Sequence, residues 1–399
     1  MIPNIRHLEL FSAVSHHGSV SAAARALHLS QPAVTQAVAA MERAFDTRLL
    51  TRSARGVVLT AAGRITAVRV DRALAQLREA FLEISRISKL ERRPGLRAAT
   101  TARLAAIVAV AEEGGFSNAA RSAKASRATL HRTARHFERL LGVELFERTS
   151  HGVRATRESE RLVRRIRLAG AEVRQAHAEV AATLGAERGE TVIGAMPLAR
   201  SSLLPAAVLA VANTHPLHQI RLLDGPYETL LRGLRDGRVD FLIGALRTSV
   251  PSDIVQEYLF DDPLAIILRS GHPLAVQTKK APLLTSLGRY AWIRPHKDSP
   301  LSKQFDELMS RIPRRQSIVP IECNSLVAAR AILLASDRLM LLSRHQVGQD
   351  VATGQLTTLP HPLGRVLRPI GLSMRRDWLP THVQREVLTE IRRCIPRTT

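Results

Sequence analysis

The chain has 399 residues, which is enough for two to four domains with full hydrophobic cores. Lys and Arg number 58 against 35 Asp and Glu, so the formal net charge is +23, which favours an acidic partner such as nucleic acid or an anionic membrane surface. Two cysteines exclude a disulfide framework and a cysteine-rich zinc site. With no apolar run near the ~18 residues of a membrane span and no signal-peptide pattern, we expect a soluble, cytoplasmic protein.

The net positive charge per residue is higher in the N-terminal half of the chain, but the C-terminal half is also positively charged. The net charge is +7 in residues 1–94, +7 in residues 95–188 and +9 in residues 189–399. The positive charge of residues 189–399 need not indicate an acidic partner. The alternative is an Arg-rich surface exposed to solvent.

An internal repeat occupies the first 156 residues. The segment Gly18–Arg25 resembles Gly114–Arg121 at an offset of 96, and the register continues without a gap to Thr60 and Thr156. Between positions 8 and 60, 16 of the 53 residues are identical in the two copies. Because two copies are too few for a solenoid, the repeat predicts a duplicated domain.

Each copy predicts three short helices followed by a hairpin. In the first copy, apolar residues recur at helical spacing over residues 8–14. Ser19 or Ser21 caps a second helix, and Ser30 begins a third that runs to about residue 45. Residues 49–60 then predict a short two-stranded wing. Three helices and a basic hairpin indicate a winged helix-turn-helix in each copy.

The third helix of each copy is the predicted DNA-recognition helix. Such a helix fits the major groove, where glutamine pairs with adenine and threonine contacts a thymine methyl group, while wing arginines reach phosphate or the minor groove. The predicted DNA-contacting residues in the first copy are Ser30, Gln31, Pro32, Thr35, Gln36, Arg52 and Arg55. Those in the second copy are Ser126, Arg127, Thr129, His131, Arg132 and Arg148. The alternative is a small helical packing domain with a solvated basic face.

The first copy resembles the N-terminal domain of the LysR-type transcriptional regulators. The resemblance rests on residues 11–14, 18–34, 49–52 and 59–63. The second copy keeps residues 119–121 and 138–149 but has Ser126-Arg-Ala where the family has Ser-Gln-Pro. The first copy has Gln36 where the family usually has arginine, and the second has Arg132 there. The resemblance implies a regulator that binds double-stranded promoter DNA as a homo-oligomer, dimer or tetramer, with RNA polymerase as a further candidate partner.

A long helix is predicted after each wing. The first carries an apolar stripe from Ile65 to Ile87, and the second carries a seven-residue seam from Leu162 to Leu184 that suits pairing with another helix. In the family the corresponding helix packs against its mate in a dimer; the alternative is an ordinary amphipathic helix on the chain's own core. Two hypotheses follow. Either the two copies pair within one chain as a pseudo-dimer, or the second copy has lost base reading and serves as a spacer or clamp.

Residues 189–399 alternate between strand and helix patterns. The predicted strands are residues 191–196, 218–223, 239–244, 264–268, 290–293, 318–321, 339–342 and 370–374. The predicted helices include residues 201–213, 227–235 and 382–394, with two more from Leu301 and Asn324. This alternation predicts a parallel α/β sheet. In residues 204–205, 230–240, 271–275 and 354–356 the segment resembles the family's effector-binding domain, which has two lobes like the periplasmic solute-binding proteins.

A small-molecule effector is expected to bind where strands of the two lobes end. The predicted effector-binding residues are Leu198, Ala199, Arg200, Ser201, Ala245, Leu246, Arg247, Arg294, His296, Asn324 and Ser325. Three arginines among them, together with helix N-termini, favour an anionic ligand, and a carboxylate is a candidate. The alternative is that these arginines are surface charges.

The predicted architecture is an α/β chain of two tandem winged helix-turn-helix domains with linker helices, followed by a two-lobed effector domain. The predicted bounds are 1–60 and 95–156 for the winged domains, 61–93 and 157–186 for the linker helices, and 189–399 for the effector domain, with one lobe at 189–260 plus 367–399 and the other at 261–366. We expect a ligand-responsive regulator, not an enzyme, without cofactor or metal. The competing hypothesis is a solute-binding or enzymatic protein whose N-terminal helices mediate association.

Overall fold

The structure is a computed structural model. It describes residues 2–53, 56–88, 90, 95–150, 152–201, 203–277, 280–297, 299–313 and 321–396. The chain divides into two compact units, and each is described by itself. The N-terminal unit runs to Glu190 and includes two short segments of later sequence, and the C-terminal unit holds the rest. Among the described helices, none has both the length and the apolar character that a bilayer crossing requires.

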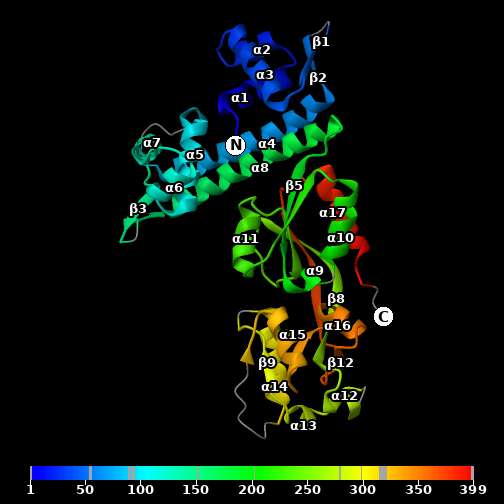
Figure 1. The fold of residues 1–399 in the computed structure, drawn as a ribbon. Coiled ribbons are helices and arrows are strands. Elements are labelled where there is room, and N and C mark those ends of the chain that lie inside the picture. Colours follow the sequence, from blue (N-terminus) through cyan, green and yellow to red (C-terminus); the bar gives the residue numbers. More distant parts are fainter. Residues whose placement is uncertain are drawn as a thin grey trace. The chain divides into compact units, whose positions relative to one another are not determined.

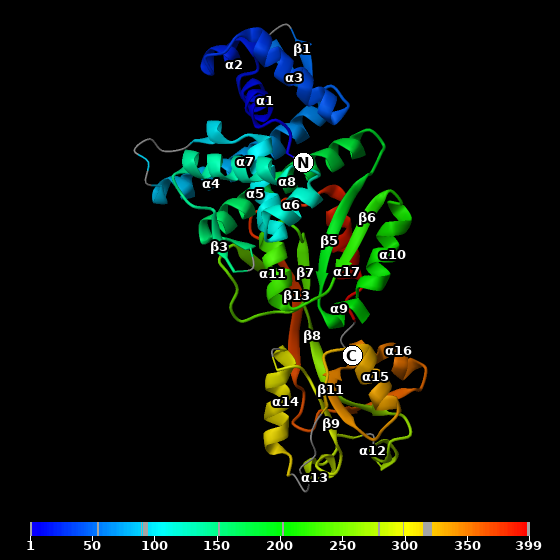
Figure 2. The ribbon, with the colours of Figure 1, turned by 60° about the vertical axis from the view of Figure 1, so that its left-hand side comes forward.

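The N-terminal unit contains two copies of the same series of elements (Figures 1 and 2). Copy 1 consists of α1 (Ile5–His17), α2 (Val20–Ala26), α3 (Gln31–Phe45), β1 (Leu50–Ser53), β2 (Gly56–Leu59) and α4 (Ala61–Ile87). Copy 2, after η1 (Leu96–Ala98), consists of α5 (Thr101–Glu113), α6 (Phe116–Ser122), α7 (Arg127–Leu141), β3 (Phe146–Thr149), β4 (Gly152–Ala155) and α8 (Arg157–Thr183). In each copy, three helices, a two-stranded antiparallel wing and a long helix follow one another.

Local sequence explains where these helices begin and end. The Ser19 side chain accepts a hydrogen bond from the Ala22 amide and caps α2, which decides between the two predicted caps. Gly18 ends α1 in the left-handed conformation at φ 61°. A Cβ atom on Gly56, which has φ 133°, would lie 2.4 Å from the carbonyl oxygen of Gly18, so glycine is required where the wing crosses the end of α1.

A buried or half-buried glutamate holds the wing to the recognition helix in each copy. The Oε1 atom of Glu42 accepts hydrogen bonds from the amides of Leu49 and Leu50 at 2.9 and 3.2 Å. Glu138, 96 residues later, accepts the equivalent two bonds at 2.8 and 3.1 Å. Charge-assisted bonds to backbone amides are stronger than neutral ones, so the position of each wing relative to its helix is fixed by one carboxylate.

The two long helices α4 and α8 pack against each other in antiparallel orientation (Figure 1). Their direction is shown by the polar contacts, because Arg69 of α4 meets Glu179 of α8 while Glu83 of α4 meets Arg165 of α8. Both copies contribute to a single hydrophobic core that extends from Ile2 to Val180. The two winged domains therefore form one folded body within one chain.

The C-terminal unit has a nine-stranded sheet. Its strands are β5 (Gly189–Ala195), β6 (His218–Leu223), β7 (Phe241–Ala245), β8 (Ile254–Arg269), β9 (Trp292–Arg294), β10 (Ile321–Glu322), β11 (Leu339–Ser343), β12 (Leu356–Pro360) and β13 (Leu367–Arg375). Its helices are α9 (Pro197–Ser201), α10 (Leu204–Thr214), α11 (Tyr227–Arg235), α12 (Pro273–Gln277), α13 (Leu284–Leu287), α14 (Pro300–Arg311), α15 (Leu326–Leu334), η2 (Arg344–Val347), α16 (Gly348–Ala352) and α17 (His382–Arg393). The strand order is β10-β9-β11-β8-β13-β7-β5-β6, and β12 pairs with β8.

The prediction of a parallel sheet is wrong for the middle of this sheet. β13 runs antiparallel to both β7 and β8, and β11 and β12 run antiparallel to β8, whereas β5–β7 and β9–β11 are parallel pairs. The cause is β8, a 16-residue strand of which only residues 264–268 are apolar enough to be predicted. Asp261, Asp262 and Pro263 interrupt its apolar pattern, so its length and direction are hidden in the sequence.

β8 and β13 are the strands that join the two lobes (Figure 2). Phe260 of β8 belongs to the same core cluster as Ile193 of β5, whereas Leu264 of β8 belongs to the cluster around β9 and β11. A single strand therefore passes from one hydrophobic core to the other. The two lobes are connected by adjacent antiparallel strands.

Candidate nucleic-acid interface and effector site

The N-terminal end of α3 is exposed. Ser30, Gln31, Pro32, Thr35 and Gln36 all lie on the surface. Pro32 occupies the first turn, as predicted, while the Ser30 side chain makes no capping hydrogen bond. The hydroxyl of Thr35 donates to the Gln31 carbonyl at 3.0 Å, so it is satisfied within the helix. The two glutamine amides are therefore the groups of α3 most available to base edges.

The wing of copy 1 is short and exposed on one face. Arg52 lies on β1 with an exposed side chain. Arg55, which was also predicted to contact DNA, lies outside the described residues. In copy 2, Arg148 on β3 is exposed at the position equivalent to Arg52.

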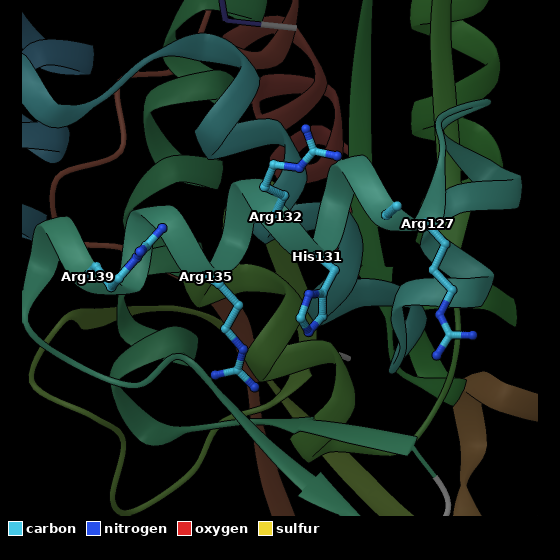
Figure 3. A pocket seen from close by; sticks show the side chains of 6 residues that line it. Arg127, His131, Arg132, Arg135 and Arg139 are labelled. Atoms are coloured by element: carbon cyan, nitrogen blue, oxygen red, sulfur yellow. The ribbon is translucent and has the colours of Figure 1, made fainter.

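The exposed face of α7 is strongly basic (Figure 3). Ser126, Arg127, Thr129, His131 and Arg132 are all exposed. The Ser126 hydroxyl accepts from the Thr129 amide at 3.4 Å and caps the helix. An open surface depression of about 830 Å³ is lined by Arg127, Ala128, His131, Arg132, Arg135 and Arg139. The predicted residues of copy 2 other than Arg148 thus lie on α7 or at its N-cap, and Arg135 and Arg139 line the same depression.

Polar contacts between α4 and α8 repeat with the same offset as the sequence. Arg69 contacts Glu172 at 2.9 Å and Glu179 at 2.8 Å. Its equivalent in copy 2, Arg165, donates to Gln76 and Glu83, each at 2.8 Å. Positions 69, 76 and 83 are each 96 residues before positions 165, 172 and 179. The two helices are therefore related by an approximate two-fold axis, as two subunits of a dimer would be.

Aromatic contacts join each long helix to the recognition helix of the other copy. Phe81 of α4 packs edge-on against Phe137 of α7, with ring centroids 6.3 Å apart. The residue equivalent to Phe81 is His177 of α8, which stacks on Phe45 of α3 at 4.0 Å. Burial lowers the pKa of His177, so the stacked ring is neutral. These contacts fix each recognition helix to the helix pair.

The predicted effector residues of the first lobe follow β5 and β7. Leu198 and Ala199 are buried in α9, while Arg200 and Ser201 are exposed. Arg200 forms an ion pair with Asp224. Ala245 and Leu246, at the end of β7, are half-buried.

Arg247 differs from the other predicted arginines. Its guanidinium carbon lies 4.1 Å from the ring centre of Tyr227, which is a cation–π contact. Among the described residues, neither the buried Nε of Arg247 nor the buried hydroxyl of Tyr227 has a hydrogen-bond partner. Burial, opposed by the charge of Arg247, raises the pKa of Tyr227, so its hydroxyl keeps its proton.

The predicted effector residues of the second lobe follow β9 and β10. Arg294 forms an ion pair with Asp306 at 3.1 Å, and its Nε is buried without a partner among the described residues. His296 lies 3.8 Å from Glu322. Asn324 is exposed, and the Ser325 hydroxyl accepts from an amide to cap α15. Ser325 therefore has a structural role whatever else it does.

Three side chains around Asp262 were missed by the sequence reasoning. Asp262 is fully buried on β8 and accepts hydrogen bonds from Ser343 and His345 at 2.6 and 2.8 Å and from Arg368 at 2.6 Å. Burial alone would raise the pKa of Asp262, but the hydrogen bonds and the charge of Arg368 hold it below its ordinary value. Only the Asp-Asp-Pro sequence within a strand region signalled this site.

Comparison with known proteins decides the family. The model of the lysR-family bacterial regulatory helix-turn-helix protein matches residues 5–64 and again residues 101–160, and the LysR substrate binding domain matches residues 184–393. The chain belongs to the LysR family of bacterial transcriptional regulators. The resemblance, the duplication and the predicted fold class are thereby confirmed, and the competing solute-binding or enzymatic hypothesis is not favoured.

Two relatives show how far the similarity extends. The HTH-type transcriptional regulator GalR of Pseudomonas putida is 31% identical over 395 residues, which covers 99% of this chain and 98% of GalR. The regulator PcaQ of Agrobacterium fabrum is 27% identical over 281 residues, covering 70% of this chain and 89% of PcaQ. This LysR-family regulator therefore has a relative that matches through both helix-turn-helix copies.

Solved structures support the fold. OxyR from Pseudomonas aeruginosa has a TM-score of 0.54 at 21% identity, covering 74% of this chain and 94% of OxyR. ArgP from Mycobacterium tuberculosis has a TM-score of 0.54 at 17% identity, covering 73% and 96%. Each covers nearly the whole of the known chain but only about three quarters of this LysR-family regulator, which has the additional copy.

Proposed function

We propose that this protein is a small-molecule-responsive transcription factor in which one chain presents two DNA-contacting helices. The observation that carries this proposal is the pairing of α4 with α8, which places two complete winged domains in one folded body. In both domains the N-terminal end of the recognition helix is exposed. A single chain thus holds two DNA-contacting helices, which other helix-turn-helix proteins bring together by dimerisation.

Footprinting tests this proposal directly. Duplexes are selected from a random pool with the purified full chain, and the bound sequence is mapped by nuclease protection. We expect two protected segments for each chain, because two recognition helices engage the duplex. Gln31→Ala should weaken protection of one segment and Arg127→Ala protection of the other. Failure to enrich any sequence would contradict a DNA-binding role, and a single protected segment would contradict two DNA-contacting helices in each chain.

We further propose that the effector is an anion, with a carboxylate as the favoured class. The support is Arg247 with Tyr227, where a cationic guanidinium and a protonated hydroxyl both have unused donors. Buried donors without partners are costly, and an anionic oxygen would satisfy them. Arg200 and Arg294 are already paired with aspartates, so Arg247 is the arginine most available to a ligand.

A thermal-shift screen with aromatic and aliphatic carboxylates tests the effector proposal. A true effector should raise the melting temperature of the wild type and of Arg232→Ala, which removes an exposed arginine on α11. It should not raise that of Arg247→Ala. Equal stabilisation of both variants would exclude Arg247 from the site. The matching amide of each carboxylate controls for charge.

The named relatives are regulators, and this supports a role in transcription rather than catalysis. We infer a cytoplasmic location, since a bacterial regulator acts where the chromosome is. We also infer that chains associate into a homo-oligomer, so that an assembly has more than two DNA-contacting helices. Sedimentation of the purified chain with and without DNA tests the assembly.

A further inference from the structure

Recognition helices α3 and α7 have the same position in their domains, but the surface of α3 is neutral and that of α7 is basic. In α3, positions 31, 35, 36, 39 and 40 hold Gln, Thr, Gln, Ala and Ala. The equivalent positions of α7, 127, 131, 132, 135 and 136, hold Arg, His, Arg, Arg and His. With histidine neutral, the net charge of α3 is zero and that of α7 is +3. The duplication has therefore kept the scaffold and changed the groups that face outward.

Most of the charge on α7 is not neutralised by the protein. Arg135 donates to the second oxygen of Glu138 at 2.9 Å, so this arginine is tied to the carboxylate that holds the wing. Arg127, Arg132 and Arg139 have no ion-pair partner among the described residues. Figure 3 shows these side chains projecting at intervals along the helix around the open depression. A concentration of unpaired guanidinium groups favours a polyanionic partner.

The distribution of this charge favours phosphate over base edges. Base-reading residues lie at the N-terminal end of a recognition helix, whereas the basic side chains of α7 run from Arg127 to Arg139, a length of about 18 Å at 1.5 Å per residue. That range extends well beyond the first turns. The sugar–phosphate backbone offers a regular series of charges at this scale. In α3, by contrast, Gln31 and Gln36 lie within the first two turns, and each can pair with the edge of an adenine.

We propose that the two copies divide the work of DNA binding: α3 selects the sequence, and α7 contacts the phosphate backbone without sequence preference. This rests on the proposed function, because it assumes that both helices meet duplex DNA. Copy 2 then contributes the part of the binding affinity that decreases as the salt concentration rises. Copy 1 contributes the preference for one DNA sequence over another.

The two copies themselves provide the test. Arg127→Gln with Arg132→Gln gives α7 the residues that α3 has at the equivalent positions. Binding of the full chain to its selected duplex and to a scrambled duplex is measured between 50 and 200 mM salt. If two phosphate contacts are lost, the slope of log K against log salt should fall by about 2, and the fourfold rise in salt should weaken the variant about tenfold less than the wild type. Affinity for both duplexes should fall by the same factor.

The matched variant is Gln31→Ala with Gln36→Ala in copy 1. It should reduce the preference for the selected duplex by tenfold or more and leave the salt slope unchanged, since it removes base contacts only. All four positions are exposed, so melting temperatures should match the wild type and exclude misfolding.

The possible results distinguish failure of the proposed division of work from failure of the proposed DNA-binding function. If the arginine variant loses only the selected duplex and keeps its salt slope, α7 reads bases, with guanine as the expected partner of arginine, and the division of work is overturned. If the arginine variant binds like the wild type, α7 does not touch DNA and the inference also fails. If the wild type binds neither duplex, the proposed DNA-binding function fails before the copies are compared.

Discussion

Single carboxylates connect distant parts of each winged domain. Glu42 and Glu138 each accept two amide hydrogen bonds, from the first residue of the wing's first strand and from the residue before it, eight and seven residues further along the chain. Glu138 also pairs with Arg135, whereas Glu42 has the neutral Ala39 at that position. The same side chain thus fixes the wing in both copies, and in copy 2 it also holds one basic residue of α7.

Replacing Glu138 should loosen copy 2 more than the same change loosens copy 1. In Glu138→Gln the two amide bonds lose charge assistance in a buried site, and Arg135 loses its partner, so we expect a loss of about 1–3 kcal/mol. Glu42→Gln, at a half-buried site with no arginine partner, is the matched control and should cost less. Urea unfolding of each full-length variant measures the difference. Equal losses would show that Arg135 contributes nothing to stability.

The stability of the N-terminal unit should fall on acidification because of His177. Burial against Phe45 lowers the pKa of this ring, so between its folded pKa and the ordinary value near 6.5 the unfolded chain binds more protons than the folded one. Stability is therefore fully present above that ordinary value and is lost as the pH falls through the window. His177→Phe introduces the residue found at the equivalent position 81 and should flatten the melting temperature between pH 7.5 and 5.5.

The exposed His17 supplies the control for this pH effect. His17→Phe removes an exposed histidine at the end of α1 and keeps His177 in place, so the pH profile should match that of the wild type. A His177→Phe profile as steep as the wild type would contradict the assignment. His272 and His361 in the C-terminal unit also have lowered pKa values because of burial, so the N-terminal transition must be followed separately, for example by proteolysis.

At the scale of elements, the polar seam between α4 and α8 is asymmetric in burial although its geometry repeats. Arg69 has a side-chain exposure of 1%, whereas the equivalent Arg165 has 28%. Burial disfavours the charge of Arg69, but Glu179 and Glu172 more than compensate and raise its pKa. The helix pair thus has one deeply buried ion network and one that reaches solvent.

Truncating these two arginines should have unequal effects. Arg69→Ala removes the partner of Glu179 and leaves Glu172 with the half-buried Arg72 alone, and breaking a buried network of this kind typically costs about 3–5 kcal/mol. Arg165→Ala removes the pseudo-equivalent but partly solvated contact and should cost about 1 kcal/mol or less. Chemical unfolding of both variants provides the comparison. Similar losses would mean that the burial difference between the two sites is not maintained in solution.

Elements that depend on local sequence were predictable, and long-range partners were not. Capping residues, helical periodicity and the 96-residue repeat placed all three helices of each copy, and residues 218–223 and 227–235 form the strand and helix predicted for them. The contact between Arg69 and Glu172 joins residues 103 positions apart, and the aspartates paired with Arg200 and Arg294 follow from tertiary packing. The hydrophobic periodicity of a sequence does not indicate which distant residues form ion pairs. The same holds for β8, because residues 261–263 hide its continuity.

At the scale of the whole molecule, pairing within one chain should make the number of DNA contacts in each bound complex independent of protein concentration. A dimeric regulator loses its second recognition helix when its concentration falls below the dimer dissociation constant, whereas here α3 and α7 belong to the same chain. We therefore expect both protected segments of the footprint to persist at chain concentrations where sedimentation shows only monomers. Loss of one segment on dilution would show that the two contacts come from different chains.

The fusion of two copies also changes what a mutation does. In a homodimer, every substitution in the recognition helix appears twice, and the half-sites on DNA must stay alike. Here a substitution in α3 leaves α7 untouched, so the two helices have been free to diverge, as their outward-facing residues show. If both helices contact DNA, a unit with two different recognition helices can bind an asymmetric target in one orientation only. The bound regulator would then have a defined orientation relative to the promoter, whereas a symmetric dimer has none.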